Sequence, residues 1–234
     1  MLTSAGFSYC KRALRAIAGH DHFLTRDTII ERERIGSDYG GWVVANGPLH
    51  AATRPVVLSF GLGDDISFDR EMIARYGTQV HAFDPTDESL TWLSDQLLPE
   101  QMHVYPIGIS NVDGTQRFTL PETDRRGNFS AKAFEGRTIE LPVMRYCSIL
   151  SMLDISRVDV LKLDIEGSEY EVIPDILSSP VRPTQLLVEF HHRIHRINVV
   201  DTLSTVRLLR DNGYALFDVS PGGRELSFIR SRLE

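Results

Sequence analysis

The chain is poor in cysteine and has no long apolar run. Cys10 and Cys147 are the two cysteines among 234 residues, and they lack the close CxxC spacing of a zinc knuckle. The sequence therefore predicts no disulfide framework, and we expect two free thiols. No apolar run approaches the length that spans a bilayer, and the N-terminus lacks the uninterrupted hydrophobic segment of a secretory signal. We expect a cytoplasmic protein with no transmembrane segment.

Positive charge is also scarce. The 25 lysines and arginines are outnumbered by 32 aspartates and glutamates, which gives a net charge of -7. Such a chain lacks the broad positive field that neutralises a phosphate backbone, so we expect no nucleic-acid partner and favour a small-molecule substrate. At the N-terminus, however, Lys11, Arg12 and Arg15 alternate with apolar residues at helical spacing. This pattern predicts a surface helix packed on the domain, with a membrane-surface or targeting helix as the alternative.

Length and composition indicate one globular domain. With 42% hydrophobic residues, the chain can bury one sizeable core. We place an N-terminal helical or lid segment at residues 1–54, packed on a Rossmann-like α/β domain at residues 55–234. These features do not determine the oligomeric state.

Strand-like and helix-like segments alternate after residue 54. The predicted strands are residues 55–60, 79–83, 103–107, 158–163, 185–190, 214–219 and 226–229, and the predicted helices are residues 69–76, 88–97, 168–177 and 200–212. Because parallel strands need crossover connections, this order predicts a mainly parallel seven-stranded sheet with helices on both faces, in three layers. The short segment SPGGRE between the last two strands allows only a hairpin, so one strand of the sheet should be antiparallel.

An insertion interrupts this alternation. Residues 116–120 and 139–146 alternate like hairpin strands around a polar segment, residues 121–137, that has few apolar anchors. We interpret residues 116–146 as an inserted hairpin and loop, and we expect it to border the acceptor site because loops at strand ends vary without disturbing the sheet.

A glycine turn follows the first predicted strand. Gly61 and Gly63 lack β-carbons, so the backbone can approach a bulky cofactor there. Asp84 follows the second strand about twenty residues later, at the spacing where a carboxylate reaches the ribose of an adenosine. A dinucleotide site would have a third glycine, whereas this chain has Asp64 and Asp65, which would repel a pyrophosphate but suit a cationic ligand such as S-adenosylmethionine. A nicotinamide-dependent oxidoreductase is the alternative.

The most specific segment is VLKLDIEGSEYEVI at residues 160–173. It places Asp164, Glu166 and Gly167 at the end of a buried strand, on the edge of the sheet that should hold the ligand. It resembles the signature of FkbM-like methyltransferases, and VLSFGLGDDISFD, HAFDPT and SDYGGW resemble segments of the same family's relatives. The resemblance extends from about residue 36 to residue 229.

This resemblance implies a class I methyltransferase fold with S-adenosylmethionine as the methyl donor. It also implies O-methylation of a hydroxyl group on a natural product, a sugar or a related small molecule. By position, Gly61 and Gly63 would line the methionine part of the donor, Asp84 would hold the ribose, and Asp164 would lie beside the methyl-transfer centre.

Other positions of the resemblance concern the donor's amino group and a lid. Many relatives have an acidic residue where this chain has Ser59, so Asp64 or Asp65 would bind the amino group instead. Tyr39 and Trp42 of the SDYGGW segment would fold over the donor or the acceptor, with packing of Trp42 against the sheet edge as an equal alternative.

Titratable residues gather at the end of the strand at residues 185–190 and directly after it. They are Glu189, His191, His192, Arg193, His195 and Arg196. Because an alcohol is a poor nucleophile until its proton leaves, we expect His191, His192, Glu189 or Asp164 to act as a base. A divalent ion held by Asp164 and Glu189 with a histidine is an alternative that would lower the pKa of the acceptor. A protein that binds S-adenosylmethionine without catalysis is a further alternative.

Overall fold

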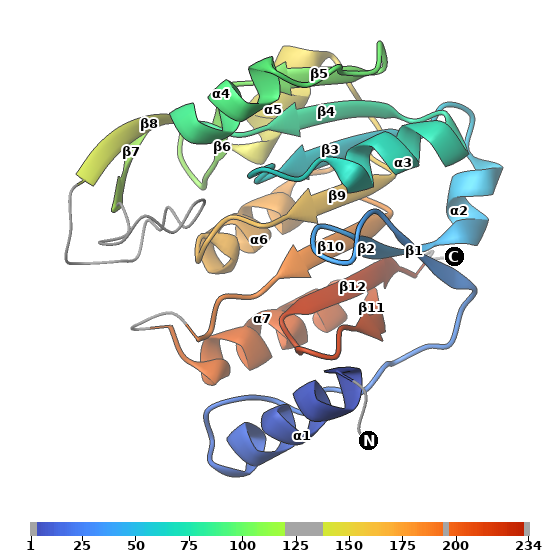
Figure 1. Cartoon of the computed structure of the whole chain (residues 1–234), viewed down its shortest axis with the longest axis vertical. Coiled ribbons are helices and arrows are strands. Elements are labelled where there is room, and N and C mark those ends of the chain that lie inside the picture. Colours follow the sequence, from blue (N-terminus) through green and yellow to red (C-terminus); the bar gives the residue numbers. More distant parts are fainter. Residues whose placement is uncertain (1–3, 120–137, 194–196, 232–234) are drawn as a thin grey trace.

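A seven-stranded sheet forms the centre of the computed structural model, which describes residues 4–119, 138–193 and 197–231 (Figure 1). In spatial order its strands are β11 (Tyr214–Val219), β12 (Glu225–Arg230), β10 (Gln185–Glu189), β9 (Val160–Leu163), β3 (Val56–Phe60), β4 (Gln79–Phe83) and β5 (Met102–Tyr105). Neighbouring strands are parallel, except that β12 runs antiparallel to both β10 and β11. The predicted sheet with one antiparallel strand is confirmed. That strand lies inside the sheet, and β11 forms the edge.

Helices cover both faces of this sheet and make three layers. One hydrophobic cluster joins the sheet to α5 (Tyr146–Leu153), α6 (Glu169–Ser178) and α7 (Val199–Asp211). A second cluster joins the opposite face to α2 (Asn46–Ala51), α3 (Ser67–Tyr76) and α4 (Asp87–Ser94). The central strand β9 reads VLKL and is buried along its whole length, as expected for a parallel strand covered on both faces.

The N-terminal segment adds a helix and a hairpin to the domain. Figure 1 shows α1 (Ser4–Ile17) beside α7 and the β11 edge. The strands β1 (Arg32–Ile35) and β2 (Trp42–Ala45) pair in antiparallel fashion and pack on the face that α3 covers. The sequence did not predict these strands, which span only four residues each. In the described ranges, no helix is both long enough and apolar enough to cross a membrane.

A small second sheet corresponds to the predicted insertion. It contains β6 (Gly108–Ile109), β8 (Thr138–Met144) and β7 (Gly114–Thr119), and β7 and β8 form the expected antiparallel pair. The polar segment predicted at residues 121–137 lies outside the described residues. The prediction was wrong at the end of this unit, because Tyr146 begins α5 and does not continue the strand.

The carboxyl ends of the central strands lie level with one another. Phe60 pairs with Phe83 on one side and with Leu163 on the other, and Leu163 pairs in turn with Val188. The segments that leave β3, β4, β9 and β10 therefore emerge at one edge of the sheet, where ligands bind in open α/β folds.

Candidate active site

A cavity of about 1130 Å³ lies at the carboxyl ends of the parallel strands. Its wall includes the turn after β3, the segment before β2, the ends of β4, β9 and β10, and the turn between β11 and β12. The cavity is larger than the roughly 300–1,000 Å³ of a pocket for one small ligand, so it has room for a donor and an acceptor together.

The glycine turn after β3 packs tightly against the end of β9. Gly61 and Gly63 have positive φ angles of 77° and 56°. A Cβ at Gly61 would lie 1.8 Å from the backbone oxygen of Asp164, whereas one at Gly63 would meet nothing within 4 Å. Below the turn, buried Lys162 donates from Nζ to the carbonyl oxygens of Phe60 and Gly61, at 3.3 and 2.6 Å. Gly61 therefore allows the close packing, and Gly63 leaves open backbone.

Asp84 follows β4 and holds this glycine turn in place. Its Oδ2 accepts hydrogen bonds from the backbone N–H groups of Leu62 at 2.9 Å and Gly63 at 3.2 Å. Its Oδ1 accepts from the backbone N–H and the hydroxyl of Thr86, at 3.0 and 2.6 Å. Asp84 also lines the cavity, where the sequence predicts a ribose-binding carboxylate. Its structural role in the turn was not predicted.

Asp65 connects the segment before β2 to the start of α3. Its Oδ2 accepts from the hydroxyl of Ser37 at 2.6 Å, and its Oδ1 accepts from the backbone N–H of Ser67 at 2.7 Å. Burial alone would raise the pKa of Asp65, but these hydrogen bonds outweigh it and hold the pKa below its ordinary value. Asp64 is exposed on the cavity wall, so its carboxylate is the more accessible of the two.

Tyr39 and Trp42 both border the cavity but differ in burial. Tyr39 is 85% exposed, whereas Trp42 is 5% exposed and packs in the hydrophobic cluster on the α3 face. The ring of Trp42 also lies 5.7 Å from Nζ of Lys162. Trp42 therefore has a packing role, and Tyr39 is the aromatic residue of this segment that a ligand could contact.

Side chains from the ends of β9 and β10 meet in the cavity, as neighbouring strands allow. The Nε2 atom of His191 lies 3.8 Å from Oδ1 of Asp164, 3.4 Å from Oε2 of Glu166 and 3.9 Å from Oε1 of Glu189. On the other side of the ring, Nδ1 lies 2.6 Å from Oε1 of Glu169, which is fully buried. The sequence nominated Asp164, Glu189 and His191, whereas the contacts of Glu166 and Glu169 come from the structure.

The protonation of this cluster differs from that of isolated side chains. Burial raises the pKa of Glu166 to about 7, and burial together with the charge of Asp164 raises the pKa of Glu189 to about 8. Burial alone would lower the pKa of His191, but the hydrogen bond to Glu169 and the surrounding carboxylates raise it to about 10. The two glutamates thus titrate near the pH range where a general base is most effective.

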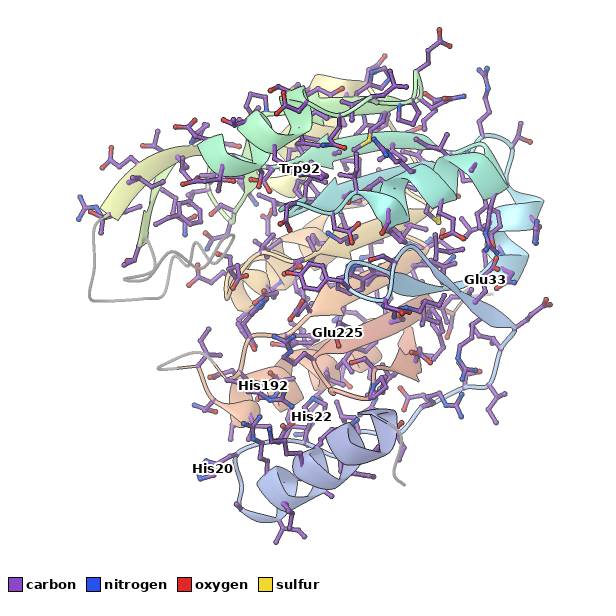
Figure 2. All side chains as sticks on the ribbon, in the orientation of Figure 1. His20, His22, Glu33, Trp92, His192 and Glu225 are labelled. Carbon is purple, nitrogen blue, oxygen red and sulfur yellow. The ribbon has the colours of Figure 1, made fainter. Side chains whose placement is uncertain are left out.

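His192 points to the other side of the chain, as two-residue alternation predicts. Its Nε2 lies 3.2 Å from Oδ1 of Asp21, and its Nδ1 lies 3.2 Å from the hydroxyl of Thr202. Figure 2 shows His192 and His22 together beside α1, and their ring centroids are 5.3 Å apart. Arg193 pairs with Asp21 in the same cluster. The structure therefore does not bring His192 to the cavity wall.

Sequence comparison assigns the family. The Methyltransferase FkbM domain matches residues 17–216 of the chain. The chain belongs to the FkbM methyltransferase family. This result confirms the resemblance of the strand-end motif, identifies the protein as an S-adenosylmethionine-dependent methyltransferase and sets aside the nicotinamide-dependent alternative. No curated protein matches this FkbM-family methyltransferase.

Several solved structures resemble the fold of the FkbM-family methyltransferase. Aeropyrum pernix fibrillarin with natively bound S-adenosyl-L-methionine has a TM-score of 0.44 and 10% identity, over 87% of this chain and 83% of that one. Human N-acetylserotonin methyltransferase, also with bound donor, has a TM-score of 0.38 and 12% identity, over 76% and 47%. The antibiotic-resistance methyltransferase Kmr has a TM-score of 0.39 and 13% identity, over 85% and 100%.

The residues of the cavity fit S-adenosylmethionine. The open backbone at Gly63 allows a close approach, and the carboxylates of Asp64, Asp84 and Asp164 lie on the same wall. Carboxylates suit a ligand that carries an ammonium and a sulfonium group.

Replacement of Asp84 should test the donor site. We expect Asp84→Ala to weaken the binding of S-adenosylhomocysteine by ~1.5–3 kcal/mol, because it removes a charged hydrogen-bond acceptor and releases the glycine turn. Calorimetric titration measures this change. Asp87→Ala, three residues later and exposed, is the matched control and should bind as the wild type does. Normal affinity in folded Asp84→Ala would contradict a donor-binding role for this carboxylate.

Proposed function

We propose that this methyltransferase transfers the methyl group of S-adenosylmethionine to a hydroxyl oxygen of a small molecule. The observation that carries the proposal is the position of Glu189 at the end of β10. Its carboxylate lies on the wall of the cavity that also contains the glycine turn, next to His191 and Asp164. A hydroxyl needs a base of this kind because its oxygen is a poor nucleophile until the proton leaves.

Glu189 is the best-placed base of the cluster. The guanidinium of Arg224 lies 2.8 Å from its Oε1 and fixes the carboxylate at the cavity wall. The Nε2 atom of His191, by contrast, faces three carboxylates. Burial raises the pKa of Glu189 to about 8, which makes its carboxylate basic enough to accept a proton from a polarised hydroxyl.

The methyl transfer depends on the alignment of donor and acceptor more than on covalent catalysis by the protein. When bound, S-adenosylmethionine supplies a methyl carbon that bonds to the acceptor oxygen while the electrons of the broken C–S bond go to sulfur, which leaves as S-adenosylhomocysteine. Glu189 takes the hydroxyl proton. The tightly packed turn at Gly61 and the end of β9 at Asp164 fix the geometry of the donor side.

The rest of the cavity suits a small organic acceptor. Phe118 and Leu141 give it an apolar wall, and Arg34, Arg193 and Arg224 add polar groups around it. Apolar walls with a few placed polar groups are typical of sites for small molecules.

The direct test is product analysis. Purified protein is incubated with donor labelled in the methyl group and with a panel of phenols, sugars and hydroxylated natural products, and labelled products are examined by NMR. We expect an O-methyl resonance in at least one product class. Label found only on nitrogen, carbon or sulfur, in a panel extended to amines and thiols, would overturn the assignment of oxygen as the acceptor atom.

A further inference from the structure

The turn between β11 and β12, residues 220–224, forms part of the cavity wall and carries Arg224 to the proposed base. Its backbone is connected to the end of β10, because the N–H of Phe190 donates to the carbonyl oxygen of Arg224 at 2.9 Å. The guanidinium of Arg224 lies 2.8 Å from Oε1 of Glu189, but the Arg224 side chain is 43% exposed. A partly exposed ion pair fixes its own geometry only weakly. The position of this guanidinium therefore depends on how firmly the turn is held.

A buried arginine of α1 holds this turn. Arg12 is 2% exposed, and its Nη1 donates to the carbonyl oxygen of Ser220 at 3.3 Å. Its Nε donates to the carbonyl oxygen of His22 at 3.1 Å, and its Nη2 donates to that of Leu24 at 3.4 Å. A Cβ added at Gly223 would lie 2.6 Å from Nε of Arg12, so the guanidinium also packs directly against the turn. Arg12 thus connects three segments of backbone through one side chain.

A second arginine connects the same turn to the segment after α1. Nη2 of Arg193 donates to the carbonyl oxygen of Gly222 at 2.6 Å, and its Nε donates to Oδ2 of Asp21 at 3.1 Å. Asp21 is buried, and its Oδ1 accepts from the backbone N–H of His22 at 2.8 Å. The N-terminal segment therefore reaches the turn at two points, Ser220 directly and Gly222 through Arg193.

The three basic residues of α1 differ in position. Lys11 and Arg15 are exposed, whereas Arg12 is buried and lies outside the cavity wall. The rings of Tyr9 and Phe23 have their centroids 5.9 and 5.0 Å from Cζ of Arg12, within the range of a cation–π contact. Burying a cation is costly unless its N–H groups are bonded, and an apolar side chain would suffice for packing alone. The polar contacts of Arg12 with the turn therefore account for its position.

We propose that Arg12 is a positioning residue of the active site. By holding the turn at Ser220, it keeps Arg224 against Glu189 and so fixes the carboxylate that takes the proton of the acceptor. Because Glu189 is the base of the proposed function, this role rests on that function. A displacement of about 1 Å caused by a mutation far from the reacting atoms can cost about a hundredfold in rate. Loss of Arg12 should therefore slow the transfer and spare the donor side, which is built on β3, β4 and β9.

Arg12→Gln tests this role when turnover is expressed per donor-binding site. Calorimetric titration with S-adenosylhomocysteine gives the number and affinity of the sites, and turnover is measured with an acceptor identified by product analysis. We expect turnover per site to fall about tenfold or more, with the affinity and the KM for the donor unchanged. A purely structural role would lower the number of sites and leave turnover per site unchanged, and that result would overturn the proposal. Arg15→Gln, on the exposed side of the same helix, is the matched control and should behave as the wild type does.

A double-mutant cycle shows whether Arg12 acts through Arg224. Arg224→Gln alone should lower turnover per site by about tenfold or more, because Glu189 loses the partner that fixes it. Adding Arg12→Gln should then cost less than about twofold, since residues that act through one another are not additive. Additive effects of the two substitutions, or normal turnover in Arg224→Gln, would overturn the proposal.

Amide hydrogen exchange provides a measurement that needs no acceptor. In Arg12→Gln, exchange should become faster at Phe190 and Gly223, whose N–H groups donate to the carbonyl oxygens of Arg224 and Ser220, and stay at the wild-type level in β3 and β9. Unchanged exchange at both amides would contradict the hold of Arg12 on the turn. If exchange is faster throughout the sheet, Arg12→Lys, which keeps a charged donor, takes the place of Arg12→Gln, and the same results are required of it.

These outcomes are separable from those of the proposed function. Methylation of hydroxyl compounds, together with unchanged turnover per site in Arg12→Gln, overturns the positioning role and leaves the proposed function standing. Label found only on nitrogen, carbon or sulfur overturns the proposed function. The cycle is then run with that acceptor, and coupling between Arg12 and Arg224 would still support the hold of Arg12 on the turn.

Discussion

Glu189→Gln should lower the turnover of a hydroxyl acceptor by about a hundredfold or more, the size expected for the loss of a positioned base. The amide keeps the shape of the side chain but cannot accept the proton at neutral pH. The affinity for S-adenosylhomocysteine should stay near the wild-type value, because Glu189 lies at the end of β10, two strands from the glycine turn after β3. Steady-state turnover and calorimetric titration of the same preparation measure the two quantities.

Two controls accompany this experiment. Glu88→Gln makes the same change on the exposed surface of α4 and should have no effect. His192→Asn should also leave turnover per folded molecule unchanged, because its ring contacts Asp21 and Thr202 outside the cavity wall. If Glu189→Gln turns over normally while His192→Asn does not, the base has been assigned to the wrong side of the strand.

Gly61→Ala should destabilise the protein severely, by more than about 3 kcal/mol, which is the range of backbone strain combined with a steric overlap. The added Cβ would lie 1.8 Å from the backbone oxygen of Asp164, so β3 and β9 would have to separate at their ends. Gly63→Ala is the matched control: its φ is also positive, but the added Cβ meets nothing within 4 Å, so it should cost only about 1–2 kcal/mol.

Urea unfolding followed by circular dichroism measures both free energies of unfolding. If the two substitutions destabilise equally, the contact with Asp164 does not matter and the left-handed backbone alone explains the cost. Gly63→Ala should nevertheless weaken donor binding, because its methyl group enters the open space on the cavity side of the turn.

The main sheet could be predicted because its strands carry a strong local signal. Residues 79–83 were predicted as a strand with the bounds that β4 has, and its position next to β3 follows from the parallel arrangement. The helix α5 was missed although Tyr146, Ile149 and Leu150 are buried at helical spacing. It contains only eight residues and begins just after β8 ends. The strand predicted at residues 139–146 therefore ran into the first turn of this helix.

The candidate site was predictable where it depends on strand neighbours and not where it depends on turn geometry. Asp164 and His191 meet because β9 and β10 are adjacent, which the order of elements already indicates. Glu166 reaches His191 through a turn in which Glu166 itself has a positive φ of 50°, a conformation that spacing alone does not reveal. The hydrogen bonds that Asp84 accepts from Leu62 and Gly63 were likewise not predicted, because contacts with backbone amides do not depend on the residue types that the sequence shows.

The position of β12 between β10 and β11 affects how the sheet can form while the chain is being synthesised. β11 is synthesised before β12 but pairs with no other strand of the sheet, so it has no partner until β12 has left the exit tunnel. Until then, β10 presents an unpaired edge that other nascent chains could join. A chain whose synthesis stops within the turn before β12 would therefore keep the β10 edge of its sheet open, and an open sheet edge makes a partly folded chain prone to aggregation.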